Sequence, residues 1–581
     1  MSRREKSIVI ALSVAIALTR LLALSHSLWD WDEGLFSTAL HHYNVAAHHP
    51  HPPGFPLYIA VARFLRLFIH DDFRALRSVE LIASFFVFPV MFALARAMKF
   101  PFAIALSAAF LLAFLPNVWF YGGTAFSDIF NLVLLLAGLA FLFEDRILLG
   151  TIFFALSLLV RPQNVLCAYP WFVAAWRVRR PRTIIAAMVI AIAIVGAGYG
   201  IAAYATGWQD FLGAVRGHGH YIATVDGFKN PNRESSLHFF PLFVIDPFEA
   251  GRTMIVVFSL AVLALVIPKK RDLDALATFG PMALFVMFML NPTGASRLSL
   301  AYMPLHALLA ADGIARIANG AGIVLRRPRA ALVVQGIVVV AIVGKLIAWN
   351  LPALREVRRH DSPPVQAMKW VRENIPAGST IFIDGGLGPQ ATLYLSSYDM
   401  HFVDGEDDLA KMPLLRNAWY VHDGPDREAP VVSFRRPLKR LYALFTRRNF
   451  SASVRRVAGT VHYLDGWYDE ESNGQELWRW MGRRGRLELQ PIATGGELRF
   501  SASVPITAEP APQVTITIDG RPMESFVAST GSFSRRYTLA PSPSSHVVML
   551  EVSGVVNPSR QHLSADARDL GLQISALSWQ P

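Results

Sequence analysis

The sequence predicts an α-helical polytopic membrane protein with a soluble C-terminal region made of an α/β unit and a β-sandwich. Of its 581 residues, 53% are hydrophobic and only 17% are charged, which is more apolar than an ordinary soluble chain. Long apolar runs fill most of residues 1–350, and a mixed composition follows. We therefore expect a membrane domain over 1–350, a small α/β domain over 351–460 and a β-sandwich over 461–581.

The basic residues fit a membrane protein better than a nucleic-acid-binding protein. The formal net charge is +12, but many Lys and Arg residues lie in clusters such as "RREK", "RVRRPR" and "PKKR" between apolar runs. Such clusters are typical of the cytoplasmic side of membrane spans. No motif that reads a nucleic-acid groove accompanies the charge, so we expect no nucleic-acid partner. Cys167 is the only cysteine, which excludes an intrachain disulfide.

About eleven segments are candidates for membrane spans, since a helix needs about 20 apolar residues to cross a bilayer. They are Ile8–Leu24, Val79–Met98, Pro101–Trp119, Thr124–Phe143, Ile147–Val160, Asn164–Trp176, Thr183–Tyr204, Met254–Ile267, Leu273–Leu290, Leu298–Ile314 and Ala330–Trp349. The first could instead be a cleaved signal peptide, but the many later spans favour an uncleaved helix. Ile147–Trp176 is too short for two full crossings, so it is either one kinked helix or, as its basic flanks favour, two short helices in a hairpin.

The C-terminal region changes its pattern twice. "SPPVQAMKWVRENIP" has a Ser cap and apolar residues at helical spacing, and "STIFIDGG" follows as a strand and turn, which predicts a small α/β unit. From about Gly466 on, alternating segments such as "QVTITIDG" and "HVVMLEVS" are separated by turn residues, as in an antiparallel sandwich. Trp467, Trp478 and Trp480 are either a sugar-stacking platform or, as we favour, residues of a core or interface.

The stretch "WDWDEGLFSTALHHYNVAAHHPHPPGF" puts many polar groups beside the first span. Asp30, Asp32 and Glu33 lie within four residues, and crowding at a low-dielectric edge raises the pKa of at least one carboxyl. This arrangement suits a general base for an acceptor hydroxyl, or a turn that only caps the next helix. The histidines of this stretch match no metal motif, and "HPPG" is better interpreted as a rigid turn than as a metal site.

Two motifs of this stretch carry a resemblance to a known family. "WDEG" followed by "HPPG" resembles the first external loop of the protein O-mannosyltransferases, where an Asp-Glu pair precedes a His-Pro-Pro segment. The layout of residues 1–350 resembles the C-type (GT-C) membrane glycosyltransferases, which include the bacterial aminoarabinose transferases. "TAFSD", "LVRPQ" and "GASRLSLAYMPLHALLAADG" resemble later positions of that superfamily. The Gly-Lys that follows His-Pro-Pro in the mannosyltransferases is absent, which leaves mannose and protein acceptors open.

The resemblance implies a hexosyl- or pentosyltransferase with a polyprenyl-phosphate sugar donor. A lipid, glycan or protein hydroxyl would attack on the external face, with inversion at the anomeric carbon. The catalytic acid falls on Asp32, with Glu33 as its neighbour, and a second external acid falls on Asp128. Arg297 resembles the family's phosphate-binding arginine, and Arg161 is the second candidate. Asp128 could instead cap a helix, and either arginine could instead snorkel to lipid headgroups.

Three histidines complete the set of candidate site residues. His51 begins the His-Pro-Pro segment, so the resemblance makes it a donor- or substrate-binding candidate. His218 and His220 lie in the long segment before Met254, where they either line the acceptor entrance or, as we favour, belong to a solvated loop. No nucleotide cofactor is indicated, because "GGLG" at Gly385–Gly388 lacks dinucleotide spacing. The need for a divalent cation stays open.

Two other function classes compete with the glycosyltransferase. Charges at membrane depth are also typical of transporters, but no inverted repeat is visible in the sequence and the acids concentrate in one loop. A non-catalytic membrane scaffold is the third class. For the enzyme we expect a multi-pass protein of the cell membrane, in a bacterium the inner membrane, with a cytoplasmic N-terminus and an external C-terminal domain.

The topology is testable with reporter fusions, since the basic clusters all fall on one side only if the N-terminus is cytoplasmic. A fusion after Asn350 should be active outside the cell membrane, and a fusion near Arg180 should be active in the cytoplasm. A cytoplasmic signal after Asn350 would show that the span count is wrong by one.

Overall fold

The chain forms two compact units in a computed structural model that describes residues 1–581 except 291–293, 325, 327, 410–417, 425–429, 446–449, 458–460, 473–476, 493–494, 506–509, 529–530 and 581. The first unit comprises Met1–Asp361 and Leu438–Arg448, and the second comprises Ser362–Pro437 and Asn449–Pro581. The helical unit therefore runs past the predicted limit at residue 350 and takes a short segment from the region expected to be a separate α/β domain.

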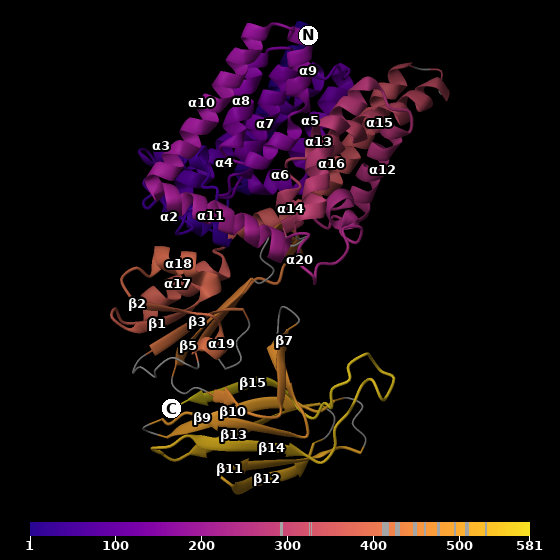
Figure 1. Cartoon of the computed structure of the whole chain (residues 1–581). Helices are drawn as coiled ribbons and strands as arrows, with labels where there is room; N and C mark the ends of the chain where they lie inside the picture. The colour runs from indigo at the N-terminus through magenta and orange to yellow at the C-terminus, as the bar shows by residue number, and fades with distance from the viewer. Residues whose placement is uncertain are drawn as a thin grey trace. The chain divides into compact units, whose positions relative to one another are not determined.

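The first unit is a bundle of helices that run side by side (Figure 1). They are α1 (Arg3–Arg20), α2 (Trp31–Ala39), α3 (Pro56–Arg66), α4 (Asp72–Ala97), α5 (Phe102–Phe114), α6 (Pro116–Tyr121), α7 (Asp128–Phe143), α8 (Ile147–Leu158), α9 (Tyr169–Val178), α10 (Pro181–Thr206), α11 (Trp208–Tyr221), α12 (Arg252–Val266), α13 (Lys270–Met289), α14 (Ala295–Leu298), α15 (Met303–Val324), α16 (Pro328–Arg359) and α20 (Lys439–Leu444). Short helical turns η1 (Leu21–Ala23), η2 (Pro162–Cys167), η3 (Ile222–Asp226) and η4 (Pro241–Ile245) join some of them.

Six helices in the described part of the chain are long and apolar enough to cross a membrane, namely α1, α4, α10, α13, α15 and α16. The helices α5, α7, α8 and α12 are shorter but also apolar. This confirms the predicted class of α-helical polytopic membrane protein. Between Ile147 and Trp176 the structure has two separate helices, α8 and α9, and the turn η2 between them begins at Pro162. The segment predicted from Leu298 begins its long helix at Met303 instead, with Pro304 in the first turn, where proline is tolerated.

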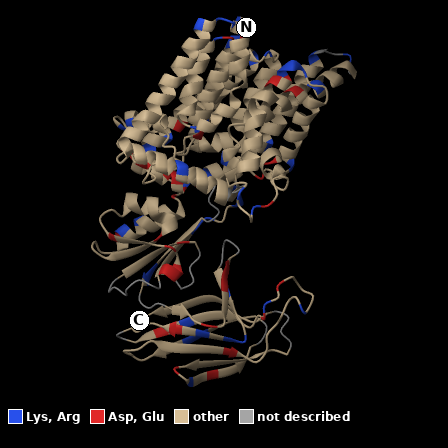
Figure 2. Ribbon diagram, in the orientation of Figure 1, with Lys and Arg blue, Asp and Glu red and all other residues tan. Residues whose placement is uncertain are grey.

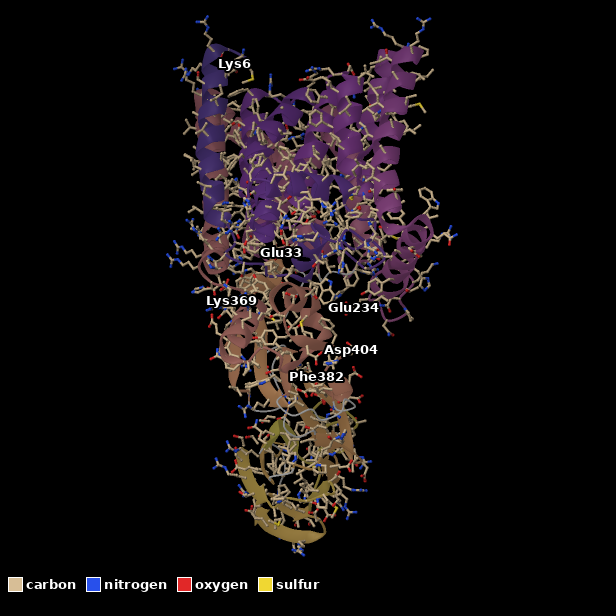
Figure 3. The ribbon with its side chains drawn as sticks, turned by 90° about the vertical axis from the view of Figure 1, so that its left-hand side faces the viewer. Lys6, Glu33, Glu234, Lys369, Phe382 and Asp404 are labelled. Carbon is tan, nitrogen blue, oxygen red and sulfur yellow. The ribbon has the colours of Figure 1, made fainter. Side chains whose placement is uncertain are left out.

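Lys, Arg, Asp and Glu residues lie mainly toward the two ends of the helical unit (Figure 2). Lys6 lies at one end, and Glu33 and Glu234 lie at the other (Figure 3). The amphipathic helix α3 buries Tyr58 and Ile59, whereas Phe64 on its other side is 59% exposed. Its 11 residues are too few to span a bilayer, so α3 has the form of a helix lying at the membrane surface.

Glycines set the closest approaches between helices. A Cβ atom on Gly313 of α15 would lie 2.0 Å from the carbonyl oxygen of Leu260 in α12. A Cβ atom on Gly123 would lie 1.9 Å from the carbonyl oxygen of Ala23. Because real Cβ atoms do not come this close to backbone, only glycine permits these two contacts. The Gly123 contact holds the end of the first span against the loop that precedes α7.

The first part of the second unit is a five-stranded sheet in the order β2-β1-β3-β5-β4. Its strands are β1 (Thr380–Asp384), β2 (Asp399–Val403), β3 (Ala418–Asp423), β4 (Val432–Arg435) and β5 (Ser451–Val457). β1 pairs in parallel with β2 and β3, and β5 is antiparallel to β3 and β4. The helices α17 (Pro363–Asn374), α18 (Gly388–Tyr394) and α19 (Glu406–Leu409) accompany it. As expected, Ser362 caps α17, and its hydroxyl accepts from the Val365 N–H.

Two further five-stranded sheets follow, in the orders β13-β10-β15-β8-β7 and β12-β11-β14-β9-β6. Their strands are β6 (Val461–Tyr463), β7 (Trp467–Ser472), β8 (Leu477–Met481), β9 (Arg484–Leu489), β10 (Gly496–Ser503), β11 (Gln513–Ile518), β12 (Arg521–Val527), β13 (Ser532–Leu539), β14 (His546–Val552) and β15 (Gln573–Gln580). Side chains of both sheets, among them Leu487, Phe500 and Trp579, form one buried core. This is an antiparallel two-sheet arrangement, as in a sandwich.

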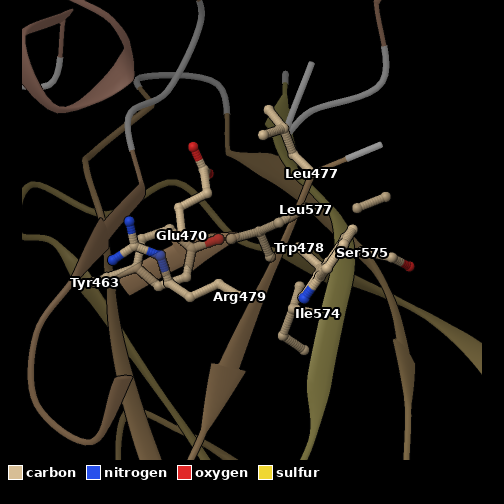
Figure 4. Close-up of a pocket in the computed structure, with 9 residues that line it drawn as sticks. Tyr463, Glu470, Leu477, Trp478, Arg479, Ile574, Ser575 and Leu577 are labelled. Carbon is tan, nitrogen blue, oxygen red and sulfur yellow. The ribbon is translucent and has the colours of Figure 1, made fainter. Parts of the chain in front are cut away.

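The three tryptophans of this region do not share one platform. Trp467 packs against the core, with its ring edge-on to Tyr463 at 4.9 Å. Trp478 and Trp480 are two residues apart in β8 and so point to the same face of that strand. Trp478 lines a small pocket together with Tyr463 and Arg479 (Figure 4).

The glycine contact between α12 and α15 predicts the effect of Gly313→Ala on stability. The added methyl group must push the two helices apart, and such overpacking typically costs about 1–3 kcal/mol. Gly320→Ala is the matched control, because it lies in the same helix with nothing within 4 Å of the new atom. Thermal unfolding of both variants in detergent measures the difference. Equal melting temperatures would contradict the contact.

Candidate active site

The three acids of the first loop have two different roles. Asp30 is the N-cap of α2, and its side chain accepts a hydrogen bond from the Asp32 N–H at 3.3 Å. Glu33 completes a capping box with Asp30. The Asp32 carboxylate instead forms an ion pair with Arg297. Helix capping therefore explains Asp30 and Glu33, and the general-base interpretation stays a prediction for Asp32.

Glu33 fastens two distant loops to each other. Its Oε2 accepts from the backbone N–H groups of Trp29 at 2.5 Å and Asp30 at 3.0 Å, and its Oε1 accepts from the N–H of Ala125 at 2.8 Å. The side chain is fully buried, and burial raises the pKa of Glu33 to about 7 while the backbone donors oppose this rise. With both oxygens engaged by backbone, Glu33 is placed to position its neighbours.

Four charged side chains form a chain of alternating sign at the same end of the helical unit. Arg297 Nη1 pairs with Asp32 Oδ2, and Arg297 Nε donates to Asp128 Oδ2 at 2.8 Å. Arg161 Nη2 donates to Asp128 Oδ1 at 2.7 Å. Asp32 and Arg297 are 265 positions apart in the sequence. We call this Asp32–Arg297–Asp128–Arg161 set the charge cluster.

The charge cluster is largely shielded from solvent. The side chains of Asp128 and Arg297 are 8% and 9% exposed. Burial alone would raise the pKa of Asp32, but the neighbouring His51 and the positive charges of Arg297 and Arg161 together outweigh it and hold the pKa of Asp32 below its usual range. The carboxylates of Asp128 and Asp32 keep the pKa of Arg297 high despite its burial. The pair of Asp32 and Arg297 is therefore held in its charged form near neutral pH.

Aromatic rings and helix ends fix both arginines. The Arg297 guanidinium lies 4.2 Å above the centroid of the Phe126 ring, and that of Arg161 lies 5.1 Å above the Phe55 ring. Such cation–π contacts stabilise a desolvated arginine. Arg297 belongs to the short helix α14, which Asn117 fastens by donating to the Ser296 carbonyl at 2.8 Å.

The structure decides the alternatives left open for Asp128 and the arginines. The N-cap of α7 is Ser127, and Asp128 follows it as the first helical residue with both oxygens on arginines. Neither Arg161 nor Arg297 reaches out to headgroups, because each pairs with a buried acid. Capping and snorkelling therefore do not explain these three residues.

A cavity lies beside the charge cluster. One wall is polar and includes Asp128, Arg161, Asn164 and Arg297. The other wall is mainly apolar and is made by Met282, Phe285, Val286, Leu290, Leu298, Leu300 and Ala301. Two walls of such different character suit a ligand with one charged end and one hydrocarbon part.

Several buried polar atoms at this site have no hydrogen-bond partner among the described residues. They include Nη2 of Arg297, Nε of Arg161, Nδ1 of His51 and Oδ1 of Asn164. A buried donor without an acceptor costs about 1–3 kcal/mol, so such atoms mark places where a ligand can restore the bond. Two of them are guanidinium nitrogens, which favours an anionic ligand.

His51 lies next to the charge cluster, with its Nδ1 at 3.6 Å from Asp32 Oδ1. Burial lowers the pKa of His51 to about 4, so its ring is neutral at pH 7. The ring of His218 lies 5.9 Å from that of His51, whereas His220 is exposed. The structure thus brings His51 and His218 to the site and leaves His220 outside it. Within the described residues, no group of three His, Cys, Asp or Glu side chains could hold a metal ion.

Two site residues escaped the sequence analysis. Glu80 of α4 is fully buried and accepts from the backbone N–H groups of Ile129 and Phe130 at 2.7 and 3.1 Å, which fixes the start of α7 behind Asp128. Asn164 donates to Asn131 at 2.7 Å in the polar wall. A carboxylate inside an apolar run is costly and marks a functional position, so Glu80 could have been found by this signal.

Comparison with protein families and with curated proteins finds no match. Among solved structures, the chain is similar to ArnT from Cupriavidus metallidurans bound to undecaprenyl phosphate, with 12% identity, a TM-score of 0.49 and coverage of 70% of this chain and 87% of that chain. It is also similar to the oligosaccharyltransferase AglB from Archaeoglobus fulgidus in complex with an inhibitory peptide and a dolichol-phosphate, with 12% identity, a TM-score of 0.44 and coverage of 69% and 65%.

A third similar structure is the arabinofuranosyltransferase AftD from Mycobacteria, with 12% identity, a TM-score of 0.43 and coverage of 100% of this chain and 59% of that chain. At these identities the similarity concerns the fold only. The site described above is defined by the contacts within this chain and takes no residue role from those structures.

The contacts of Glu33 predict that Glu33→Gln destabilises the site. One carboxylate oxygen would be replaced by an NH₂ group facing backbone N–H donors, and a buried donor left unpaired costs about 1–3 kcal/mol. Thermal unfolding in detergent should show this loss, with Glu5→Gln in the exposed first turn of α1 as the control. If Glu33→Gln melts like the control, the carboxylate does not fasten the two loops.

Proposed function

We propose that the chain is a membrane glycosyltransferase that moves a hexosyl or pentosyl group from a polyprenyl-phosphate donor to an acceptor hydroxyl, with inversion at the anomeric carbon. The acceptor is a lipid, a glycan or a protein. The reaction takes place at the Glu33 end of the helical unit, which we expect to be external.

The observation that carries this proposal is the unpaired guanidinium donors beside a two-sided cavity. Arg297 Nη2 and Arg161 Nε lack partners among the described residues, and a phosphate supplies the acceptor oxygens they need. The apolar wall, with Phe285 and Leu290 among its residues, fits an isoprenoid chain. A polyprenyl phosphate combines both chemistries in one molecule.

The transfer is a single displacement at the anomeric carbon. The acceptor oxygen attacks from the side opposite the phosphate and forms the new C–O bond, while its proton passes to the Asp32 carboxylate. The bond between the anomeric carbon and the phosphate oxygen breaks, and the electron pair leaves with the phosphate. Arg297 and Arg161 neutralise the charge that develops on this leaving group.

The ion pair between Asp32 and Arg297 explains how donor binding raises the basicity of Asp32. Paired with Arg297, Asp32 is ionised but a weak base, because the arginine holds its pKa low. A phosphate bound at Arg297 competes for the same guanidinium. Asp32 then loses part of its counter-charge and becomes more basic at the moment when the donor is present.

The direct test incubates the purified full chain in membranes with a panel of polyprenyl-phosphate sugars and an acceptor mixture. Release of polyprenyl phosphate that depends on acceptor supports a transferase. Passage of a solute across the membrane without cleavage of any donor would support the transporter interpretation instead.

Asp32→Asn should lower turnover by about 10²- to 10⁴-fold, the usual cost of removing a general base. Donor affinity should be kept or rise, because the amide keeps the shape of the side chain but no longer competes with the phosphate for Arg297. Arg297→Lys keeps the charge but loses the planar donor pair, so it should weaken donor affinity by roughly 10-fold. Turnover and donor titration in the same membranes measure both.

The matched controls lie at the other end of the helical unit. Asp145 and Arg177 pair there at 3.5 Å and are both partly exposed, so Asp145→Asn and Arg177→Lys should behave like the unaltered protein. Near-normal turnover by Asp32→Asn would remove Asp32 from the reaction and contradict the proposed mechanism.

A further inference from the structure

A short piece of the C-terminal half of the chain belongs to the helical unit. Leu438–Arg448 is part of that unit, although Pro437 before it and Asn449 after it belong to the second unit. Its helix α20 is short, but Leu441, Leu444 and Phe445 are at most 2% exposed. The segment is therefore packed as a core element.

The Phe445 side chain packs on Trp29, just before the helix α2 that carries Asp32. Its ring is stacked on that of Trp29, with the centroids 6.0 Å apart and the planes 11° from parallel. The ring of Phe120 meets it edge-on at 5.0 Å. Trp29 in turn donates its backbone N–H to Glu33. Phe445 thus reaches Asp32 through Trp29 and the capping box of α2.

The carbonyl of Leu444 is connected to Arg297 of the charge cluster through two aromatic residues. The Tyr121 hydroxyl donates a hydrogen bond to this carbonyl. The Tyr121 ring packs edge-on against Phe126 at 5.3 Å, and Phe126 carries the Arg297 guanidinium on its face at 4.2 Å. A second path of contacts therefore runs from α20 to Arg297.

We infer that Leu438–Arg448 is a positioning element of the active site, supplied by the C-terminal half of the chain. The inference rests on the proposed function for what is positioned, namely the base Asp32 and the phosphate ligand Arg297. Phe445 positions the start of α2, and with it Asp32, through Trp29, and the Leu444 carbonyl positions Arg297 through Tyr121 and Phe126. Both Phe445 and Leu444 act through other residues, so neither is a catalytic residue.

The two paths lead to different kinetic effects. Phe445→Ala removes the ring behind Trp29 and loosens the base, so kcat should fall by roughly 10- to 100-fold with the donor KM within about twofold. Tyr121→Phe removes only the hydroxyl, so the ring that packs on Phe126 and Arg297 is no longer tied to the Leu444 carbonyl. For this variant, the affinity for polyprenyl phosphate should fall about threefold or more, which thermal shift measures without turnover.

Controls separate positioning from folding. Phe92 is also a buried phenylalanine of the helical unit, 4% exposed and edge-on to Phe102 at 5.6 Å, so Phe92→Ala should lose stability without losing kcat per folded molecule. Phe445→Tyr keeps the ring and should recover most of kcat. All variants are made in the full chain and counted as folded protein by size-exclusion chromatography.

The outcomes are distinct. If Phe445→Ala and Phe92→Ala have equal kcat per folded molecule, and Tyr121→Phe binds polyprenyl phosphate like the unaltered protein, the segment is only an anchor and the inference is overturned. If the unaltered chain releases no polyprenyl phosphate from any donor, the proposed function fails. The binding arm then still decides whether α20 positions Arg297.

Discussion

The buried chain of alternating charges, Asp32–Arg297–Asp128–Arg161, is the interaction on which this end of the helical unit depends. Each ion costs several kcal/mol to bury, and an ion that loses its partner there destabilises a protein by about 3–5 kcal/mol. Two acids and two arginines cancel, so the set can exist among apolar helices. It also ties together α2, α7, α14 and the break after α8, which are far apart in the sequence.

The residues around the charge cluster hold backbone in place. Glu33 and Glu80 each accept hydrogen bonds from N–H groups of a distant loop or helix end, and Asn117 does the reverse by donating to a carbonyl of α14. The polar site in this apolar bundle thus consists of four charged side chains and a set of further side chains that restrain the loops between helices. Such restraint matters for any reaction at this site, because a misplacement of reacting groups by about 1 Å can lower the reaction rate by a large factor.

Much of the fold could be predicted from the sequence, because apolar runs and alternating strands are local patterns. Single elements were missed where the pattern was weak: β12 has mostly exposed residues, and so lacks the alternation of a half-buried strand. Candidate site residues such as Asp32 and Arg297 were found from motifs. The role of Glu33 was not, since its partner Ala125 lies 92 positions away. Nor does any local signal reveal that α20, between two parts of the second unit, packs with the helices.

The place of Leu438–Arg448 in the chain has a consequence for biosynthesis. Proteins fold from the N-terminus while they are being made, and all four members of the charge cluster are translated well before Phe445. A nascent chain can therefore assemble its ion pairs early. It lacks the contacts of Leu438–Arg448, however, until most of the C-terminal half has left the ribosome. Such an order ties the maturation of the site to synthesis past Phe445, so chains that terminate before this residue would stay in the membrane with an unfinished site.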